Sequence, residues 1–457
     1  MMKDYDVVVI GDGSGSSIVE NALVHGAKVA LIDEPPIGGT CQNVGCIPSK
    51  MVIYPADVIA KIQDAKKLGV YAQVEKVDFK SIMNRMRQER KESQEFQKEG
   101  IGKVSNLDYF RGECYFIDEY TLQINDEKIK GNKIFIVSGA RPLIPPIKGL
   151  DDVNYLTNET LLELDELPKS LVIIGGGYIA VEYAHFFSAM GTKVTIVERS
   201  DRLVSHEEAE ISDLLKKELM KRMSVFTNIE IVEVLQDEDL FKVKGNHVKE
   251  NDPQWFSAEK ILVAAGRKSN ADRLKVEKTG VKLDKKGYIK VNEFLETSQD
   301  NIWSFGDAIG KHMFKHVANE EAFVAFNNAF HDEKVKMKYH AVPHAIFSHP
   351  QIASVGLTEE EARKNGYDLL IGTANYDQVA KGLSMIESNG FAKAIVDKND
   401  LTILGFHIIG PFAPIVIQEV ITIMELKGQV GHIGQAMHIH PALPELIQRT
   451  LANLEEK

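Results

Sequence analysis

The chain contains the same pattern of apolar run, glycine-rich turn and helical stretch twice. The first copy is 11–16 (GDGSGS), which follows the apolar run 4–10, and the second is 175–180 (GGGYIA), which follows 171–174. Glycines at these spacings let the backbone approach a pyrophosphate, whose charge the helix N-terminus stabilises. Two copies predict an α/β protein with two dinucleotide-binding domains. The third position of the first motif is Ser16, so we expect helix and strand to pack slightly further apart there.

An acidic residue ends the apolar run that follows each glycine-rich turn. These residues are Asp33 after the first turn and Glu198 after the second. A carboxylate at this position accepts hydrogen bonds from ribose hydroxyls. Glu198 would also repel a 2′-phosphate, which predicts NAD(H) as the second dinucleotide. Arg199 and Arg202 stand close by, so NADP(H) stays possible.

Two of the three cysteines, Cys41 and Cys46, stand in 38–50 (GGTCQNVGCIPSK). Their spacing places them on different faces of a regular helix, but a distorted first turn can bring the sulfurs within bonding range. A helix N-terminus lowers the pKa of a thiol, so a thiolate formed there is reactive at neutral pH. Three cysteines exclude a secreted disulfide scaffold and favour an intracellular redox pair. The third, Cys114, is expected in the core.

The cysteine segment resembles the redox-active disulfide of the class I FAD-dependent pyridine nucleotide–disulfide oxidoreductases, which include dihydrolipoamide dehydrogenase, glutathione reductase, mycothione reductase and mercuric reductase. Three further segments extend the resemblance along nearly the whole chain: 136–142 (IVSGARP), 263–270 (VAAGRKSN) and 302–308 (IWSFGDA). The resemblance implies FAD at the first glycine-rich turn and NAD(P) at the second. It also implies two Rossmann-like domains followed by a C-terminal α+β dimerisation domain.

The implied domains are 1–150 for the first FAD-binding segment, 151–272 for the NAD(P)-binding domain, 273–338 for the second FAD-binding segment and 339–457 for the dimer-interface domain. No apolar run is long enough to span a membrane, and the first residues lead directly into a strand pattern, which predicts a cytoplasmic protein. The formal charge of −12 disfavours nucleic-acid and membrane-surface roles. The charge-rich stretches 85–98 and 207–222 are expected to form solvated helix faces.

Near the end of the chain stands 438–445 (HIHPALPE). The family has a histidine before a proline and a glutamate five positions after the histidine, a pattern that His440 and Glu445 match; His438 is expected to be structural. Histidine changes protonation near neutral pH, and a carboxylate holds its tautomer. The resemblance assigns Cys46 to the flavin and Cys41 to exchange with substrate sulfur. It also implies a homodimer in which each active site combines residues of both subunits.

The resemblance assigns further residues to cofactors. Lys50 and Glu182 are expected to pair beside the flavin, and Tyr178 to cover its face until the nicotinamide binds. The residues expected at FAD are Gly11, Gly13, Ser14, Gly15, Ser16, Asp33, Gly39, Thr40, Lys50, Ser138, Gly139, Gly306 and Asp307. Those expected at NAD(P) are Gly175, Gly177, Tyr178, Ile179, Glu182, Glu198, Arg199 and Gly266. No metal site is expected.

The resemblance implies that the substrate is a small-molecule or lipoyl-domain dithiol or disulfide. Glutathione disulfide calls for arginine near the first helix, and 17–25 has none, whereas neutral lipoamide needs only an apolar channel. Together with Glu198, the absence of arginine from 17–25 favours the activity of a dihydrolipoamide dehydrogenase. The strings GSGSSI, MVIYPADVIAK, KHVANEEA and IHPALPE look closest to mycothione reductases, which leaves an NAD(P)H-dependent reductase of low-molecular-weight disulfides as the alternative.

Two other classes fit less well. A mercuric reductase is expected to carry a C-terminal cysteine pair, and this sequence ends NLEEK. Flavin NAD(P)H oxidases usually have one redox cysteine and lack the His–Glu motif. An oxidase and a non-catalytic scaffold are therefore remote alternatives.

Overall fold

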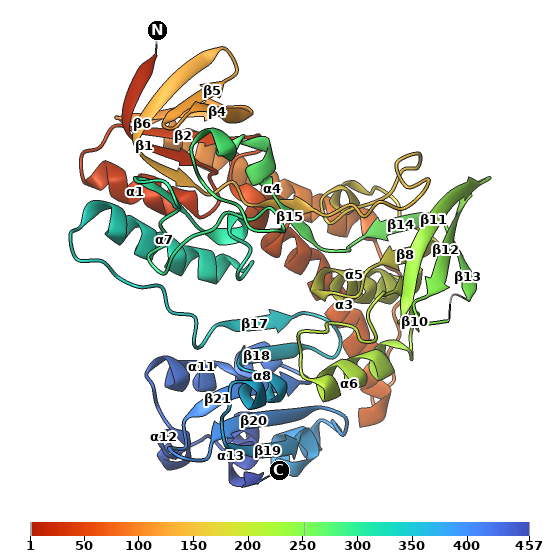
Figure 1. The fold of residues 1–457 in the computed structure, drawn as a ribbon. Helices are drawn as coiled ribbons and strands as arrows, with labels where there is room; N and C mark the ends of the chain where they lie inside the picture. The colour runs from red at the N-terminus through yellow and green to blue at the C-terminus, as the bar shows by residue number, and fades with distance from the viewer. Residues whose placement is uncertain (1, 251, 457) are drawn as a thin grey trace. The chain divides into compact units, whose positions relative to one another are not determined.

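The computed structural model describes residues 2–250 and 252–456, which form two compact units (Figure 1). The first unit contains residues 2–51, Met83–Leu143 and Gly266–Lys338. The second contains Val52–Ile82, Ile144–Ala265 and residues 339–456. The domain boundaries expected from the sequence stay a prediction.

The first unit is built on a sheet with the strand order β3-β2-β1-β6-β5-β4, in which β16 also pairs with β6. The strands β1, β2, β3, β6 and β16 pair in parallel, and β4 and β5 are antiparallel. Parallel strands bring their carboxyl ends to one edge, where dinucleotides bind in such sheets. The strands are β1 (Lys3–Ile10), β2 (Val29–Asp33), β3 (Leu107–Arg111), β4 (Cys114–Asp118), β5 (Thr121–Ile124), β6 (Glu127–Ile136) and β16 (Ile302–Ser304).

Helices α1 and α7 lie side by side next to this sheet (Figure 1). A two-stranded antiparallel ribbon of β7 (Ala140–Pro142) and β15 (Arg267–Ser269) completes the strands of the unit. Two long helices continue from one unit into the other, α3 at Met51 and α4 at Met83. The helices are α1 (Gly15–Val24), α2 (Gly39–Asn43), α3 (Cys46–Asp64), α4 (Phe79–Ile101) and α7 (Lys315–Phe330).

The second unit contains a parallel sheet with the order β10-β9-β8-β14 and an antiparallel sheet with the order β11-β12-β13. Helix α5 packs on β8 and β9 directly after the second glycine-rich turn. The elements are β8 (Ser170–Ile174), α5 (Tyr178–Met190), β9 (Lys193–Val197), α6 (Ala209–Leu219), β10 (Ser224–Phe226), β11 (Ile229–Asp237), β12 (Leu240–His247), β13 (Pro253–Ala258) and β14 (Lys260–Val263).

The C-terminal part of this unit is an antiparallel sheet with the order β17-β18-β21-β20-β19-β22. Its core includes Phe406, Tyr376 and Leu446. The strands are β17 (Pro343–Ile346), β18 (Ile352–Gly356), β19 (Leu369–Asn375), β20 (Phe391–Asp397), β21 (Ile403–Ile409) and β22 (Glu455–Glu456). The helices are α8 (Glu359–Lys364), α9 (Ala380–Ser384), α10 (Ala413–Val416), α11 (Gln418–Glu425), α12 (Val430–Gln435) and α13 (Glu445–Ala452).

The structure confirms the predicted fold class, with two Rossmann-like sheets and a C-terminal α+β part. Cys114 lies in the core of the first unit, as expected. One expectation was wrong: Glu207 and Glu208, placed on a solvated helix face, are buried just before α6. In 2–250 and 252–456, no helix is both long and apolar enough to cross a membrane.

Candidate active site

The first glycine-rich turn lies in backbone contact with the start of α2. A Cβ atom on Gly39 would lie 2.6 Å from the Cα atom of Gly13, so the contact leaves no room for a side chain at Gly39. Asp12 fixes the contact, because its Oδ2 accepts a hydrogen bond from the Gly38 N–H at 2.7 Å. The cysteine segment that begins here is therefore fastened to the turn that the sequence assigns to a pyrophosphate.

Gly11 and Gly15 pack the turn against the strands. Gly11 has a φ of +109°, and a Cβ atom on it would collide with the Val137 carbonyl oxygen. A Cβ atom on Gly15 would lie 2.7 Å from Cγ1 of Val9. The close approach of helix and strand therefore occurs at Gly15, the residue before the third motif position. Ser16 turns its hydroxyl back to donate to the carbonyl oxygen of Gly13 at 3.1 Å.

Two polar atoms at this edge of the sheet are buried without a hydrogen-bond partner among the described residues. They are Oδ2 of Asp33 and Oγ of Ser138. Burial raises the pKa of Asp33 to about 7, and the negative charge of Asp12 adds to the shift. A buried acceptor with no protein donor at the end of β2 fits a ribose hydroxyl, so these residues fit the adenosine half of FAD. Gly139, with a φ of +68°, follows Ser138.

The 3₁₀ turn Gly306–Ala308 follows β16 at the same sheet edge. The Gly306 N–H donates to Oε2 of Glu321 at 2.7 Å, and Asp307 forms an ion pair of 3.4 Å with Arg267. Burial raises the pKa of Asp307, and the Arg267 charge opposes that rise. Sequence reasoning assigned no role to Arg267 or Glu321. The available signal was a charged residue beside an apolar segment, at Arg267 shortly after 261–265 and at Glu321 directly before 322–326. A charged residue in a sequence is usually at the surface, so this signal was not used.

Cys41 and Cys46 lie on two consecutive helices. Cys41 is in α2, Cys46 is the first residue of α3, and the chain bends at Val44 and Gly45 between them. A Cβ atom on Gly45 would lie 2.9 Å from the Thr40 carbonyl oxygen, so glycine allows the close bend. Both cysteines are free thiols, and their side chains are hydrogen-bonded. The distorted turn expected from the sequence is therefore a break between two helices.

The hydrogen bond between the two cysteines favours a proton on Cys41. The hydrogen bond from Cys41, followed by the Lys50 charge, lowers the pKa of Cys46 to about 6 against the effect of burial. The same hydrogen bond, together with burial, raises the pKa of Cys41. Lys50 stands four residues after Cys46 on α3, which places the two residues on one face of the helix. At neutral pH the geometry therefore favours a thiolate on Cys46 and a thiol on Cys41.

Glu182 and Tyr178 lie on α5 in the second unit. The Glu182 side chain is 3% exposed at the residue level, and its Oε1 accepts from the Phe347 N–H at 2.9 Å. Tyr178 is the first residue of the helix and is partly exposed. Lys50 belongs to the other unit, so its pairing with Glu182 and the covering role of Tyr178 stay predictions.

The second glycine-rich turn repeats the packing of the first. Gly175 has a φ of +115°, and a Cβ atom on it would collide with the Ala264 carbonyl oxygen. A Cβ atom on Gly176 would lie 2.9 Å from Cβ of Glu198, so the turn lies directly against the acidic residue. Gly177 is the N-cap of α5, where Ile179 is the second residue of the helix. A glycine-rich turn packed against an acidic residue and followed by a helix N-terminus is the arrangement that binds a nicotinamide dinucleotide, so these residues fit that cofactor.

The charged groups around Glu198 are paired within the fold. Oε1 of Glu198 accepts from the Ser200 N–H at 2.6 Å. Arg199 pairs with Glu230 at 3.6 Å, and Arg202 pairs with Asp213 at 3.6 Å. Each arginine therefore already lies against a carboxylate. Gly266, with a φ of +122°, joins β14 to β15.

His440 and Glu445 form the pair that their spacing predicts. Nδ1 of His440 lies 2.8 Å from Oε1 of Glu445, and Oε2 of Glu445 accepts from the Ala442 N–H at 2.8 Å. The His440 hydrogen bond, followed by that of Ala442, lowers the pKa of Glu445. The His440 side chain is 71% exposed. The carboxylate therefore fixes one ring nitrogen and leaves the other directed away from it.

His438 has a different environment. Its side chain is 6% exposed, and its two ring nitrogens contact the Ala436 carbonyl oxygen at 3.0 Å and the Glu419 carboxylate at 2.9 Å. Both nitrogens are used within the fold, which supports the structural role that the sequence suggested.

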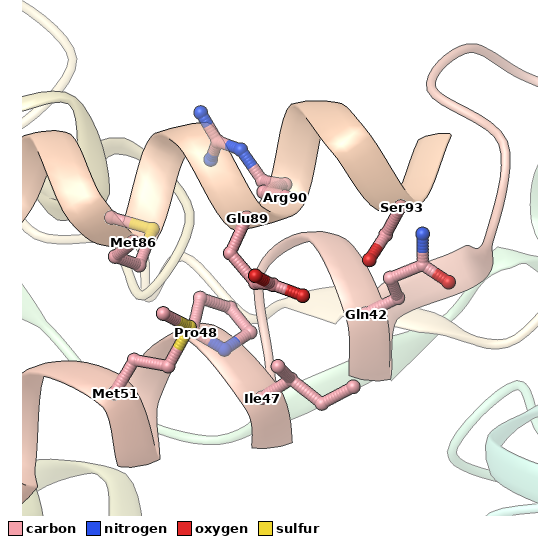
Figure 2. Close-up of a pocket in the computed structure, with 8 residues that line it drawn as sticks. All are labelled: Gln42, Ile47, Pro48, Met51, Met86, Glu89, Arg90 and Ser93. Atoms are coloured by element: carbon pink, nitrogen blue, oxygen red, sulfur yellow. The ribbon is translucent and has the colours of Figure 1, made fainter. Parts of the chain in front are cut away.

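A pocket lies beside the cysteine segment, between α2, the first turns of α3, and α4 (Figure 2). The empty volume of the pocket, including its open mouth, is about 190 Å³. In Figure 2, Glu89 extends from α4 toward Pro48 and Ile47 at the start of α3. The lining residues are Gln42, Ile47, Pro48, Met51, Met86, Glu89, Arg90 and Ser93.

Comparison with known proteins agrees with this geometry. The family model described as pyridine nucleotide-disulphide oxidoreductase matches residues 5–322, and the model of the dimerisation domain of that family matches 342–451. The chain belongs to this family. Members of this family are oxidoreductases that use FAD and NAD(P)H and form homodimers through the dimerisation domain. These properties confirm the predictions from the sequence.

The family contains relatives of several activities. The chain is 33% identical to mycothione reductase of Mycobacterium tuberculosis H37Rv, over 99% of this chain and 100% of that protein. It is 31% identical to dihydrolipoyl dehydrogenase of Bacillus subtilis, over 98% of this chain and 97% of that protein. The structure of the HOCl-induced flavoprotein disulfide reductase RclA from Escherichia coli superposes with a TM-score of 0.87 at 27% identity, covering 98% of this chain and 99% of that one.

Proposed function

We propose that the protein couples NAD(H) to a small dithiol or disulfide through FAD and the Cys41–Cys46 pair, and that oxidation of dihydrolipoamide by NAD is its best activity. The observation that carries this proposal is the cysteine pair itself, in which two free thiols on consecutive helices are joined by a hydrogen bond from Cys41 to Cys46. An interchange dithiol needs such a pair, because one sulfur exchanges with substrate while the other leaves as a thiolate.

In the proposed direction, a substrate thiolate attacks Sγ of Cys41 in the Cys41–Cys46 disulfide and displaces the Cys46 thiolate. The second substrate thiol then attacks the substrate sulfur of the mixed disulfide, closes the substrate disulfide and releases Cys41. Two electrons have then passed from the substrate to the cysteine pair. FAD, when bound, passes such an electron pair on to the nicotinamide.

His440 of the partner subunit is proposed as the base. It takes the proton of each attacking substrate thiol and returns one proton to Cys41. The Glu445 contact supports this role, because a carboxylate on Nδ1 holds the proton there and leaves Nε2 as the acceptor. The exposure of His440 supports it as well, since a base for an external thiol has to be reachable.

Two features support NAD(H) and a neutral dithiol. Glu198 lies against the second glycine-rich turn, where a carboxylate disfavours a 2′-phosphate. The exposed face of the first helix, Gly15–Val24, has no basic residue for an anionic disulfide. The relationship to dihydrolipoyl dehydrogenase is consistent with this choice.

A second candidate is NAD(P)H-driven reduction of a sugar-thiol disulfide of the mycothione type. The pocket beside the cysteine segment favours it, because Gln42, Glu89 and Ser93 offer hydrogen-bonding groups that suit hydroxyl-bearing substrates. The full-length relationship to mycothione reductase is consistent with it as well.

A steady-state panel distinguishes the two candidates. Dihydrolipoamide is tested with NAD, and lipoamide, glutathione disulfide and a sugar-thiol disulfide are each tested with NADH and with NADPH. We expect the highest kcat/KM for dihydrolipoamide with NAD. Turnover of dihydrolipoamide near background, beside rapid reduction of the sugar-thiol disulfide, would establish the second candidate instead.

A further inference from the structure

The loop 199–208, which joins β9 to α6, contacts the second glycine-rich turn. The Val204 N–H donates to the Gly176 carbonyl oxygen at 2.8 Å. A Cβ atom on Gly176 would lie 2.7 Å from Cδ2 of Leu203, which is fully buried, and 2.9 Å from Cβ of Glu198. The Ser200 N–H, at the other end of the loop, donates to Oε1 of Glu198 at 2.6 Å. The loop therefore holds both the turn and the acidic residue beside it.

Val204 has an uncommon backbone conformation within this loop. Its φ is +41°, and a β-branched residue rarely adopts the left-handed region. Such a conformation persists only where the surrounding structure holds it. The Val204 N–H is bonded to Gly176, and the Val204 carbonyl oxygen accepts from the Glu207 N–H at 2.8 Å. The contacts of Val204 therefore lead from the glycine-rich turn to Glu207.

Glu207 is fastened to the C-terminal sheet of the same unit. Its Oε1 is in hydrogen-bond contact with Nε2 of His344 on β17, and its Oε2 accepts from Oγ of Ser354 on β18 at 2.6 Å. His344 and Ser354 stand opposite each other in the pairing of these strands. The Glu207 side chain is 3% exposed. Burial raises the pKa of Glu207, but the hydrogen bond and charge of His344 bring it below its ordinary value.

The neighbouring Glu208 has different partners. Its Oε2 accepts from Nζ of Lys393 at 2.6 Å, and its Oε1 accepts from the Glu359 N–H at 2.6 Å. Glu208 stands at the N-cap of α6, so its contacts fasten the helix. A buried ion pair is weak evidence for stability, because apolar packing often stabilises a fold as well. The Glu207 pair is better explained by the position that it gives to the loop.

We infer that Glu207 is a positioning residue for the nicotinamide dinucleotide: bound to His344 and Ser354, it holds the loop 199–208 against the second glycine-rich turn and keeps Glu198 in place for the adenosine ribose. The inference rests on the proposed function, because it takes this turn as the nicotinamide site. His344 and Ser354 lie within 342–451, the part that matches the family's dimerisation domain. That domain therefore supports nucleotide binding in its own chain.

The test uses ADP-ribose, which has the adenosine ribose and the pyrophosphate of NAD but no nicotinamide and so accepts no hydride. Its affinity for the FAD-loaded protein is measured by isothermal titration calorimetry. We expect Glu207→Gln to weaken binding by roughly tenfold, because a displaced Glu198 loses its charge-assisted hydrogen bonds to the ribose. Glu419→Gln is the matched control, since it breaks another His–Glu pair of the unit, His438–Glu419, and should leave the affinity unchanged.

Flavin reduction by NADH, followed by stopped-flow absorbance, separates positioning from damage to the active site. In Glu207→Gln the half-saturating NADH concentration should rise by about the same factor as the ADP-ribose dissociation constant, roughly tenfold. The limiting rate should stay at the wild-type value, because no group near the flavin has changed. A lowered limiting rate with an unchanged half-saturating concentration would contradict the inference.

A double-mutant cycle tests whether Glu207 acts through Glu198. Residues that act through one another have effects that do not add. In a Glu198→Ala protein, Glu207→Gln should therefore change the ADP-ribose affinity far less than in the wild type. A full further tenfold loss in that background would mean that Glu207 supports the fold in general, and it would overturn the inference.

A milder variant covers the case in which Glu207→Gln fails to fold. Ser354→Ala removes one hydrogen bond of the Glu207 carboxylate and leaves its contact with His344. We expect it to weaken ADP-ribose binding by about threefold. An affinity equal to that of the Glu419→Gln control, in Glu207→Gln or, where that variant does not fold, in Ser354→Ala, would overturn the inference.

Failure of the proposed function would be recognised separately. Neither measurement uses a dithiol or disulfide, so the substrate panel can fail while the inference holds. An unchanged ADP-ribose affinity in Glu198→Ala would refute the placement of the dinucleotide and the inference with it. A loss in Glu198→Ala without a loss in Glu207→Gln would keep the placement and refute the inference alone.

Discussion

Cys41 keeps its proton and Cys46 loses its own because a single hydrogen bond joins two unequal environments. The hydrogen bond raises the pKa of Cys41 and lowers that of Cys46, burial raises both, and Lys50, one turn after Cys46, lowers the pKa of Cys46 further. The assignment of Cys46 to the flavin and Cys41 to the substrate comes from the family resemblance and stays a prediction. Spacing alone could not say which sulfur carries the charge.

The first residue-level prediction concerns the Cys46 thiolate. A Cys41→Ser holoprotein should show a long-wavelength charge-transfer absorption with oxidised flavin at neutral pH without any reductant, because its Cys46 is left as a free thiolate. Since the pKa of Cys46 is lowered to about 6, the thiolate is present above that pH, and the band of the two-electron-reduced wild type should fade as the pH falls through about 6. Cys46→Ser should lack the band. A Cys41→Ser protein without it at every pH above neutrality would refute the assignment of the sulfurs.

The second residue-level prediction concerns Glu198. The wild type should show a lower KM for NADH than for NADPH, and Glu198→Arg should shift the preference toward NADPH. Loss of charge-assisted hydrogen bonds to the ribose costs on the order of 1.5–3 kcal/mol, or roughly tenfold or more in affinity. Initial rates with both nicotinamides measure the change. A strong wild-type preference for NADPH would show that the arginines decide the specificity.

At the scale of secondary-structure elements, a buried lysine joins the start of α6 to the C-terminal sheet. Nζ of Lys393 on β20 lies 2.6 Å from Glu208, 3.1 Å from Glu210 and 2.8 Å from Glu359. Its side chain is 3% exposed. Burial alone would raise the pKa of Glu359, but the hydrogen bond from Lys393 lowers it. Several elements therefore depend on one positive charge.

The element-level prediction follows from this cluster. Lys393→Met should lower the free energy of unfolding at pH 7 by about 3–5 kcal/mol, because it leaves the buried Glu208 carboxylate without its cation. A carboxyl group with a lowered folded-state pKa contributes stability above its unfolded pKa and loses it as the pH falls. The difference from wild type should therefore shrink below about pH 4. Denaturant unfolding measures it, with the exposed Lys398→Met as control. A loss as small as that of the control would contradict the buried ion cluster.

Most elements that carry the site were predictable from the sequence. The strand that contains 193–197 has the expected bounds, and the runs before both glycine-rich turns are strands. These elements are fixed by local apolar pattern and by glycine conformation. Residues such as Glu207, Glu208 and Lys315 were not predictable, because their partners are far away in the chain. Composition marks them as surface charges, and only tertiary contacts bury Glu207 and Glu208 and bring Lys315 to the first glycine-rich turn.

At the scale of the whole molecule, the proposed active site has two parts that belong to different units. The cysteine pair lies in the first unit, and the His440–Glu445 pair lies in the second. The family's dimerisation domain covers 342–451 and therefore contains His440 and Glu445. A two-fold dimer can join the cysteines of one subunit to the histidine of the other, and each dimer then has two equivalent shared sites.

Mixed dimers test this shared site most directly. Homodimers of Cys46→Ser and of His440→Ala should each be nearly inactive. After co-refolding in equal amounts, about half of the dimers are mixed, and in a shared arrangement each mixed dimer has one site with both lesions and one intact site. Activity with the best substrate of the panel should then recover to roughly one quarter of wild type. If His440 acted on the cysteines of its own chain, every site would carry a lesion. Mixed dimers that are shown to be present but recover no activity would contradict the account.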